Sequence, residues 1–210
     1  MKELLFNNNY TCVAVSKTKP TTDIKKIYNL GHKDFGENKV QELEIKYKNL
    51  PKDINWHMIG HLQTNKVKKI VPFITLIHSV DSIKLLKVIN KESKKINKIT
   101  NCLIQVNISN EDSKYGFNFE ELNSLDIEFL KNFENIKIKG LMGMASYSSN
   151  EKNIQKEFNL LNRQYINLKK LMESFDTLSM GMSNDYKLAL KEGSNMIRVG
   201  SKIFGERNYH

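Results

Sequence analysis

The chain has 210 residues, with 33 lysines and arginines against 23 aspartates and glutamates, and 40% of it is hydrophobic. This length suits one domain with its own core, and the composition excludes a disordered chain. No apolar run approaches the roughly 20 residues of a membrane span, and residues 1–10 do not resemble a signal peptide. Cys12 and Cys102 lie in apolar runs, so we expect reduced core thiols and a cytoplasmic protein.

The net charge of +10 raises nucleic acid as an alternative partner. The basic residues are 30 lysines but only 3 arginines, whereas nucleic-acid-binding surfaces favour the planar fork of arginine. The densest cluster, Lys66, Lys68 and Lys69, has no interleaved aromatic residue on which a base could stack. We therefore predict a solvated basic surface, with no specific nucleic acid and no membrane among the partners.

Short apolar runs alternate with segments of helical period along the whole chain. The runs are residues 12–16, 34–36, 56–59, 76–80, 102–106, 136–144, 178–180 and 196–199. Apolar residues spaced by three and four predict helices over 40–50, 83–96 and 154–172. Asp81 is the expected N-cap of the 83–96 helix, and a Ser148–Glu151 capping box is expected to open the last.

Eight strands, each but the last followed by a helix, predict parallel βαβ units. The alternatives are an open doubly wound sheet and a closed (β/α)8 barrel. We favour a single barrel domain over 1–210, since eight units fit about 200 residues. Glycines fall at or near the carboxyl ends of the runs (Gly36, Gly60, Gly143, Gly181 and Gly200), where barrel sites are built and a backbone approaches its ligand closely.

Lys17 follows the first apolar run. A lysine at the carboxyl end of a buried strand would place its amine in the barrel mouth. Partial desolvation there would lower its pKa from about 10.4 and supply the neutral amine that a Schiff base requires. On this segment alone, a lysine that snorkels to solvent is the stronger interpretation.

The last two strands end in segments that suit an anion. Ser183 follows a glycine turn after run 178–180, and Arg198 lies on the last run, just before Gly200 and Ser201. Backbone N–H groups and hydroxyls after strands seven and eight commonly hold phosphate in barrels. We call these two segments the phosphate cradle, and Arg198 could reach inward from beside it. A lysine that faces a phosphate cradle is typical of a site for pyridoxal phosphate (PLP).

Five segments resemble the YggS/PROSC family of pyridoxal phosphate homeostasis proteins. They are VAVSKTKP at 13–20, FGEN at 35–38 with QE at 41–42, WHMIGHLQTNK at 56–66, SMGMS at 179–183, and IRVGSKIFG at 197–205. The resemblance covers nearly the whole chain from Cys12 onward. It implies an alanine racemase-type barrel, that is, fold type III among PLP proteins.

The resemblance also implies roles for single residues. Lys17 would carry the cofactor as an aldimine, and Arg198 would contact its pyridine nitrogen. Ser183, Gly200 and Ser201 resemble the family's phosphate ligands, while Asn38 and His61 resemble residues that line the cofactor. No metal is implied, because His57 and His61 lack the helical glutamate of a metalloprotease.

An arginine at the pyridine nitrogen makes the ring a poor electron sink. Racemases of this barrel class take a second acid/base from a separate domain. The sequence ends at His210, just after the last predicted strand, so we do not expect such a domain here. We therefore predict a carrier that buffers PLP and delivers it to apo PLP-dependent enzymes, without established turnover. The alternative is a small PLP-dependent amino-acid racemase of the same fold.

Two departures and one further feature accompany this resemblance. The family's N-terminal helix is expected to be shortened or missing, since few residues precede Cys12. Ala145-Ser146 stands where the family has alanine-proline. Lys19 and Lys114 could receive a second aldehyde, but we interpret them as solvated loop lysines.

Nothing in the sequence indicates an obligate interface, so we expect a monomer.

Overall fold

The computed structural model describes residues 1–109 and 115–206 and contains a closed barrel of eight parallel strands in sequential order. The strands are β1 (Thr11–Val15), β2 (Asp34–Glu37), β3 (Asn55–Met58), β4 (Leu76–Val80), β5 (Thr100–Val106), β6 (Ile136–Gly143), β7 (Thr177–Ser179) and β8 (Met196–Val199). β1 pairs with β8 in parallel, which closes the ring and confirms the predicted barrel over the open sheet.

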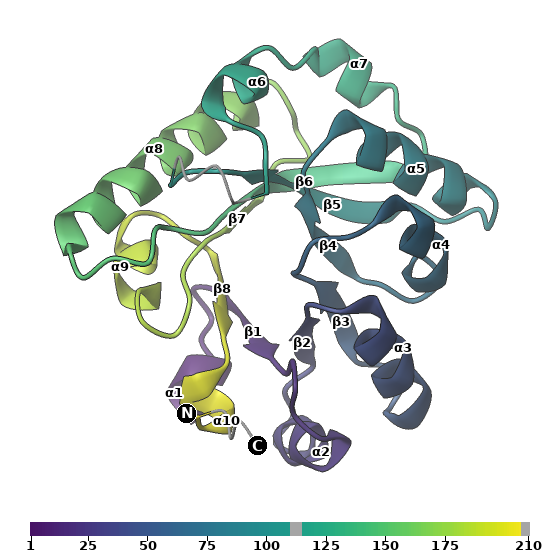
Figure 1. Ribbon diagram of the computed structural model, residues 1–210, viewed down its shortest axis with the longest axis vertical. Coiled ribbons are helices and arrows are strands. Elements are labelled where there is room, and N and C mark those ends of the chain that lie inside the picture. The colour runs from purple at the N-terminus through teal and green to yellow at the C-terminus, as the bar shows by residue number, and fades with distance from the viewer. Residues whose placement is uncertain (110–114, 207–210) are drawn as a thin grey trace.

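Helices cover the outside of the ring of strands (Figure 1). They are α1 (Lys2–Leu5), α2 (Thr21–Asn29), α3 (Val40–Asn49), the 3-10 turn η1 (Thr64–Lys66), α4 (Val67–Ile70), α5 (Ile83–Lys94), α6 (Phe119–Asn123), α7 (Ile127–Lys131), α8 (Glu151–Lys169), α9 (Tyr186–Lys191) and α10 (Ser201–Phe204). The short α10 follows β8, so the last strand also has its helix, contrary to our expectation.

Side-chain alternation along the strands separates two apolar layers. The larger core packs the outward faces of the strands against the helices, and includes Phe35, Trp56 and Leu86. A smaller cluster lies within the barrel and contains Val13, Leu76, Leu103, Met142 and Met196. Val13 and Val15 are two residues apart, so the same alternation turns both toward the interior, and Lys17 follows in the turn after β1.

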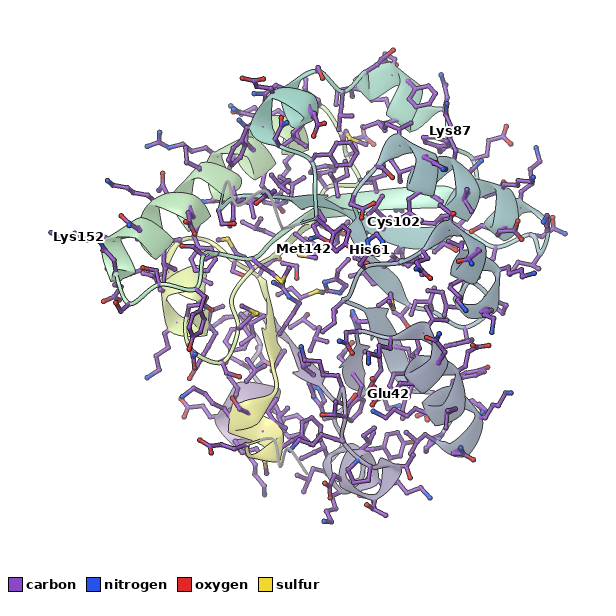
Figure 2. The ribbon with its side chains drawn as sticks, in the orientation of Figure 1. Glu42, His61, Lys87, Cys102, Met142 and Lys152 are labelled. Carbon is purple, nitrogen blue, oxygen red and sulfur yellow. The ribbon has the colours of Figure 1, made fainter. Side chains whose placement is uncertain are left out.

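The charged helical faces point away from the barrel. Lys87 on α5 and Lys152 on α8 project at the periphery of the view, whereas Met142 lies near its centre (Figure 2). In the described part of the chain, no helix is long and apolar enough to cross a membrane.

Both predicted helix caps were wrong. Ser82, not Asp81, caps α5, because the Ser82 hydroxyl accepts the N–H of Leu85 at 3.2 Å. Asn150, not Ser148, caps α8 and accepts the N–H groups of Lys152 and Asn153. In each case the residue immediately before the helix is the N-cap, because its side-chain oxygen reaches the first-turn N–H groups directly.

Candidate functional site

A cavity of about 830 Å³ opens at the carboxyl ends of β1, β6, β7 and β8. Lys17 lines it together with Val15. Ser183, Gly200 and Ser201, which follow β7 and β8, also line it, so the structure brings together four of the seven predicted site residues. This volume suits a ligand the size of a small cofactor.

The wall after β7 and β8 is built from backbone that approaches the cavity closely. Gly200 N–H donates to the Ser183 hydroxyl at 3.2 Å, which joins the two predicted cradle segments. Gly181 has a φ of +97°, and a Cβ there would lie 2.6 Å from the Cβ of Ala189. Ser201 begins α10, whose first N–H groups have no partner within the helix. This wall therefore offers hydroxyl and N–H donors to an anion.

Arg198 is buried in the barrel beside this wall, and only 4% of it is exposed. Its Nη1 donates to Ser179 Oγ at 2.6 Å and its Nη2 to the carbonyl of Gly143 at 2.9 Å. Burial lowers the pKa of Arg198 to about 10, although Asp185 opposes the shift. Arg198 itself does not line the cavity, but Met144, next to its partner Gly143, and Gly200, two residues after Arg198, both do.

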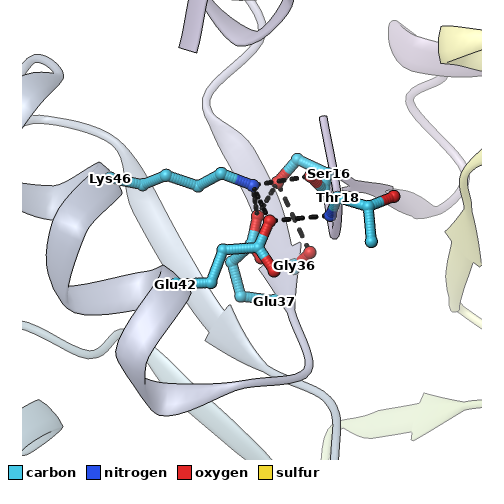
Figure 3. Close-up of polar contacts among 6 residues, drawn as sticks. All are labelled: Ser16, Thr18, Gly36, Glu37, Glu42 and Lys46. Carbon is cyan, nitrogen blue, oxygen red and sulfur yellow. Dashed lines mark hydrogen bonds and ion pairs between the residues drawn. The ribbon is translucent and has the colours of Figure 1, made fainter. Parts of the chain in front are cut away.

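The peptide groups on both sides of Lys17 are held by a cluster from β2 and α3 (Figure 3). Lys46 Nζ donates to the Ser16 carbonyl at 2.7 Å and to the carboxylates of Glu37 and Glu42 at 2.7 and 2.6 Å. The Thr18 N–H donates to Glu42 at 2.7 Å, and Thr18 adopts a φ of +65°. We call Ser16, Glu37, Glu42 and Lys46 the Lys17 clamp, because they fix the backbone that presents Lys17.

Glu37, like Ser16, has no exposed surface. Its Oε1 accepts the Ser16 hydroxyl at 2.5 Å, while its Oε2 has no hydrogen-bond partner among the described residues. Burial raises the pKa of Glu37 to about 7, against the opposing influence of Lys46. Sequence reasoning recorded this glutamate only as part of a motif and missed its link to Lys46, since that link depends on how α3 folds back.

Asn38 and His61 lie on the opposite side of the mouth and do not line the cavity. Gly60 packs so tightly on Asn38 that a Cβ at Gly60 would lie 2.4 Å from the Asn38 carbonyl oxygen. His61 donates to Asp81 at 2.8 Å and stacks on Tyr115 with ring centroids 3.9 Å apart. Asp81, which the sequence predicted as a helix cap, binds His61 instead.

Lys19 is not the solvated loop lysine that we expected. Its Nζ donates to the carbonyls of Phe204, Gly205 and Glu206, at 3.2, 3.3 and 3.0 Å. It therefore ties the loop after β1 to the carboxyl end of α10. Lys114 falls outside the described residues.

The chain is similar to known proteins over nearly its whole length. The model of the alanine racemase N-terminal domain matches residues 1–208. A pyridoxal phosphate homeostasis protein of Aquifex aeolicus is 39% identical over 199 residues, which cover 94% of this chain and 87% of that protein. A protein of the same name from Helicobacter pylori is also 39% identical, with 92% and 86% coverage. The chain belongs to the pyridoxal phosphate homeostasis protein family.

Solved structures agree with this family assignment. PipY of Synechococcus elongatus, solved with PLP bound, superposes with a TM-score of 0.86 at 31% identity and covers 95% of this chain and 94% of that one. Alanine racemase of Clostridium difficile superposes with a TM-score of 0.78 at 14% identity, over 97% of this chain and 53% of that one. The second likeness establishes the shared barrel fold alone.

The site of this family member fits PLP on its own chemistry. Lys17 and Lys19, which follow β1, both line the cavity, and the segments after β7 and β8 offer hydroxyl and N–H donors for a phosphate. The buried guanidinium of Arg198 lies next to these segments. In contrast, the described residues contain no group of three or more His, Cys, Asp or Glu side chains placed to hold a metal ion.

Proposed function

We propose that this protein binds PLP covalently through Lys17 and serves PLP homeostasis by buffering the cofactor and delivering it to apo PLP-dependent enzymes. The observation that carries the proposal is the shared cavity of Lys17, Ser183, Gly200 and Ser201. Relatives named as homeostasis proteins, and the PLP-bound structure of PipY, support the same ligand.

Each wall of the cavity would have its own task. Lys17 would bond the cofactor aldehyde as a Schiff base, and the Lys17 clamp would hold the lysine backbone in place. Ser183, Ser201 and the backbone at Gly200 would bind the phosphate. Arg198 would face the pyridine nitrogen, with Asn38 and His61 farther out at the mouth. Bound PLP supplies a reactive aldehyde and a ring that delocalises negative charge.

The other ionisable side chains of the cavity support a carrier over a racemase. Lys19 already donates to three carbonyls, and Asp185 accepts the N–H of Met182 at 2.5 Å. Tyr147 is 98% exposed at the rim, and Glu206 is also exposed. A racemase needs a second proton-transfer group that is held within reach of its substrate in a water-excluding site, and none of these four groups meets that description.

Absorbance spectroscopy tests the proposal. Purified wild type is titrated with PLP beside Lys17→Ala, and each sample is then treated with borohydride. We expect a visible band in the wild type that reduction removes, and no such band in the variant. L-Alanine is then added, and the appearance of D-alanine is followed by chiral chromatography. A wild type without the band would overturn PLP binding through Lys17, and steady racemisation would favour the enzyme.

A further inference from the structure

A continuous chain of polar side chains crosses the interior of the barrel. Its members are Asp34 on β2, His57 on β3, His78 on β4, Ser179 on β7 and Arg198 on β8. Barrel interiors are ordinarily filled by branched apolar side chains. His78 and Ser179 have no exposed surface here, whereas the Asp34 side chain is 28% exposed. The chain therefore runs from a partly solvated carboxylate to the buried guanidinium beside the cavity.

Each link has hydrogen-bond geometry. Asp34 Oδ1 lies 3.1 Å from His57 Nε2, and His57 Nδ1 lies 2.9 Å from His78 Nε2. His78 Nδ1 lies 3.0 Å from Ser179 Oγ, which accepts Nη1 of Arg198 at 2.6 Å. We call these five residues the interior chain.

One arrangement of protons satisfies all four links with neutral histidines. A guanidinium can only donate, so Ser179 Oγ accepts from Arg198 and its own hydrogen is free to bond His78 Nδ1. His78 then carries its proton on Nε2 and donates to His57 Nδ1. In turn, His57 carries its proton on Nε2 and donates to the carboxylate of Asp34. All four hydrogen bonds point in one direction, from the cation to the anion, with both histidines neutral.

The charges around the interior chain agree with a neutral His78. Burial, with His57 and Arg198 as neighbours, holds the pKa of His78 well below its ordinary value. Burial alone would raise the pKa of Asp34, but hydrogen bonds from His57 and Asn55 outweigh it and lower that pKa. Asp34 is therefore an anion at neutral pH and accepts, as the assigned direction requires.

We propose that Ser179, His78, His57 and Asp34 are positioning residues that fix the orientation of Arg198 for the cofactor ring. This inference rests on the proposed function, in which Arg198 faces the pyridine nitrogen. Among the described residues, two groups accept hydrogen bonds from the guanidinium of Arg198: Ser179 Oγ and the Gly143 carbonyl. Because the Ser179 hydroxyl donates its hydrogen to His78, a lone pair of Ser179 Oγ stays directed toward Arg198.

Nitrogen-15 NMR of the histidine rings, on protein without added cofactor, tests the proton assignment directly. We expect His57 and His78 to be neutral with the proton on Nε2 at pH 7.5. In Ser179→Ala the bond to His78 Nδ1 is lost, so the His78 resonances should shift while those of the distant His61 stay in place. A wild-type His78 protonated on Nδ1 would overturn the assigned direction.

PLP titration of variants tests the positioning role. In Ser179→Ala we expect the PLP dissociation constant to rise about tenfold and the absorption band to shift, since a buried hydrogen bond to a charged group is lost. His78→Gln, whose amide can both accept and donate, should retain more affinity than His78→Leu. Met142→Leu changes the interior apolar cluster at the register partner of Ser179 but removes none of the four hydrogen bonds, so it controls for packing.

Two results separate failure of this inference from failure of the proposed function. A folded Ser179→Ala that binds PLP with the wild-type affinity and spectrum would overturn the positioning role while PLP binding stands. A wild type that forms no visible adduct would overturn the proposed function, and the positioning role with it.

Discussion

The carboxylate of Glu42 accepts the backbone N–H of Thr18 at 2.7 Å, so a side chain of α3 holds the peptide group that follows Lys17. Glu42→Ala removes this bond and one partner of Lys46. We expect a loss of about 2 kcal/mol in the free energy of unfolding and several-fold weaker PLP binding. Urea denaturation and PLP titration measure both. Glu44→Ala on the same helix breaks only a surface pair with Lys69 and should change neither.

The pKa of Glu37 predicts a pH-dependent stability. Since burial raises this pKa from 4.5 to about 7, the folded state favours the protonated carboxyl. This contribution is fully present below pH 4.5 and is lost as the pH rises through 7. Unfolding of wild type and Glu37→Gln is compared at pH 5 and pH 8. Between pH 5 and pH 8, we expect the free energy of unfolding of Glu37→Gln to rise relative to that of the wild type, by on the order of 3 kcal/mol at most.

The same comparison can contradict the account. If the free-energy difference between wild type and Glu37→Gln moves in favour of the wild type at pH 8, Glu37 is ionised in the fold. The pair with Lys46 would then dominate over burial.

Lys46 is a cation buried between two carboxylates, with 5% of its side chain exposed. At pH 8, above the pKa of Glu37, Lys46→Met leaves the Glu37 carboxylate without its cation, and we expect a loss of about 3–5 kcal/mol in the free energy of unfolding. The double variant Glu37→Met with Lys46→Met removes both buried charges and should recover most of this loss. Thermal denaturation of the two variants decides the matter. A double variant less stable than the single one would show that the charges themselves stabilise the fold.

Gly181 combines a positive φ with close packing, and a matched glycine separates the two effects. Gly31 has a φ of +100°, and its nearest Cβ neighbour would be Phe6 at 4.0 Å. Both alanine variants should lose about 1 kcal/mol or more from backbone strain. Gly181→Ala should lose more, because its Cβ meets Ala189 at 2.6 Å, and it alone should weaken PLP binding. Equal losses and unchanged PLP affinity would argue against a cradle at this turn.

The sequence predicted eight strands and a closed barrel, because periodicity marks the strands and eight βα units fit the chain length. The run at 34–36 was too short to identify alone, yet it forms β2 and supplies Asp34 to the interior chain. The pairing of Gly-Ser segments after β7 and β8 was also predicted, and the Gly200–Ser183 hydrogen bond joins them.

The Lys17 clamp and the interior chain could not be predicted from the sequence. Lys46 looked like one more exposed helical lysine, because only the packing of α3 turns it toward Glu37. His78 and Ser179 are 101 residues apart and meet only across the closed barrel. Such contacts depend on strand register and closure, which hydrophobic period does not specify.

The most direct test of the account is peptide mapping of the protein after it is loaded with PLP and reduced with borohydride. Mass spectrometry would locate the added pyridoxyl phosphate group among the 30 lysines. The account predicts a single major label on Lys17 and none at this position in Lys17→Ala. A major label on another lysine, with Lys17 unmodified, would contradict it.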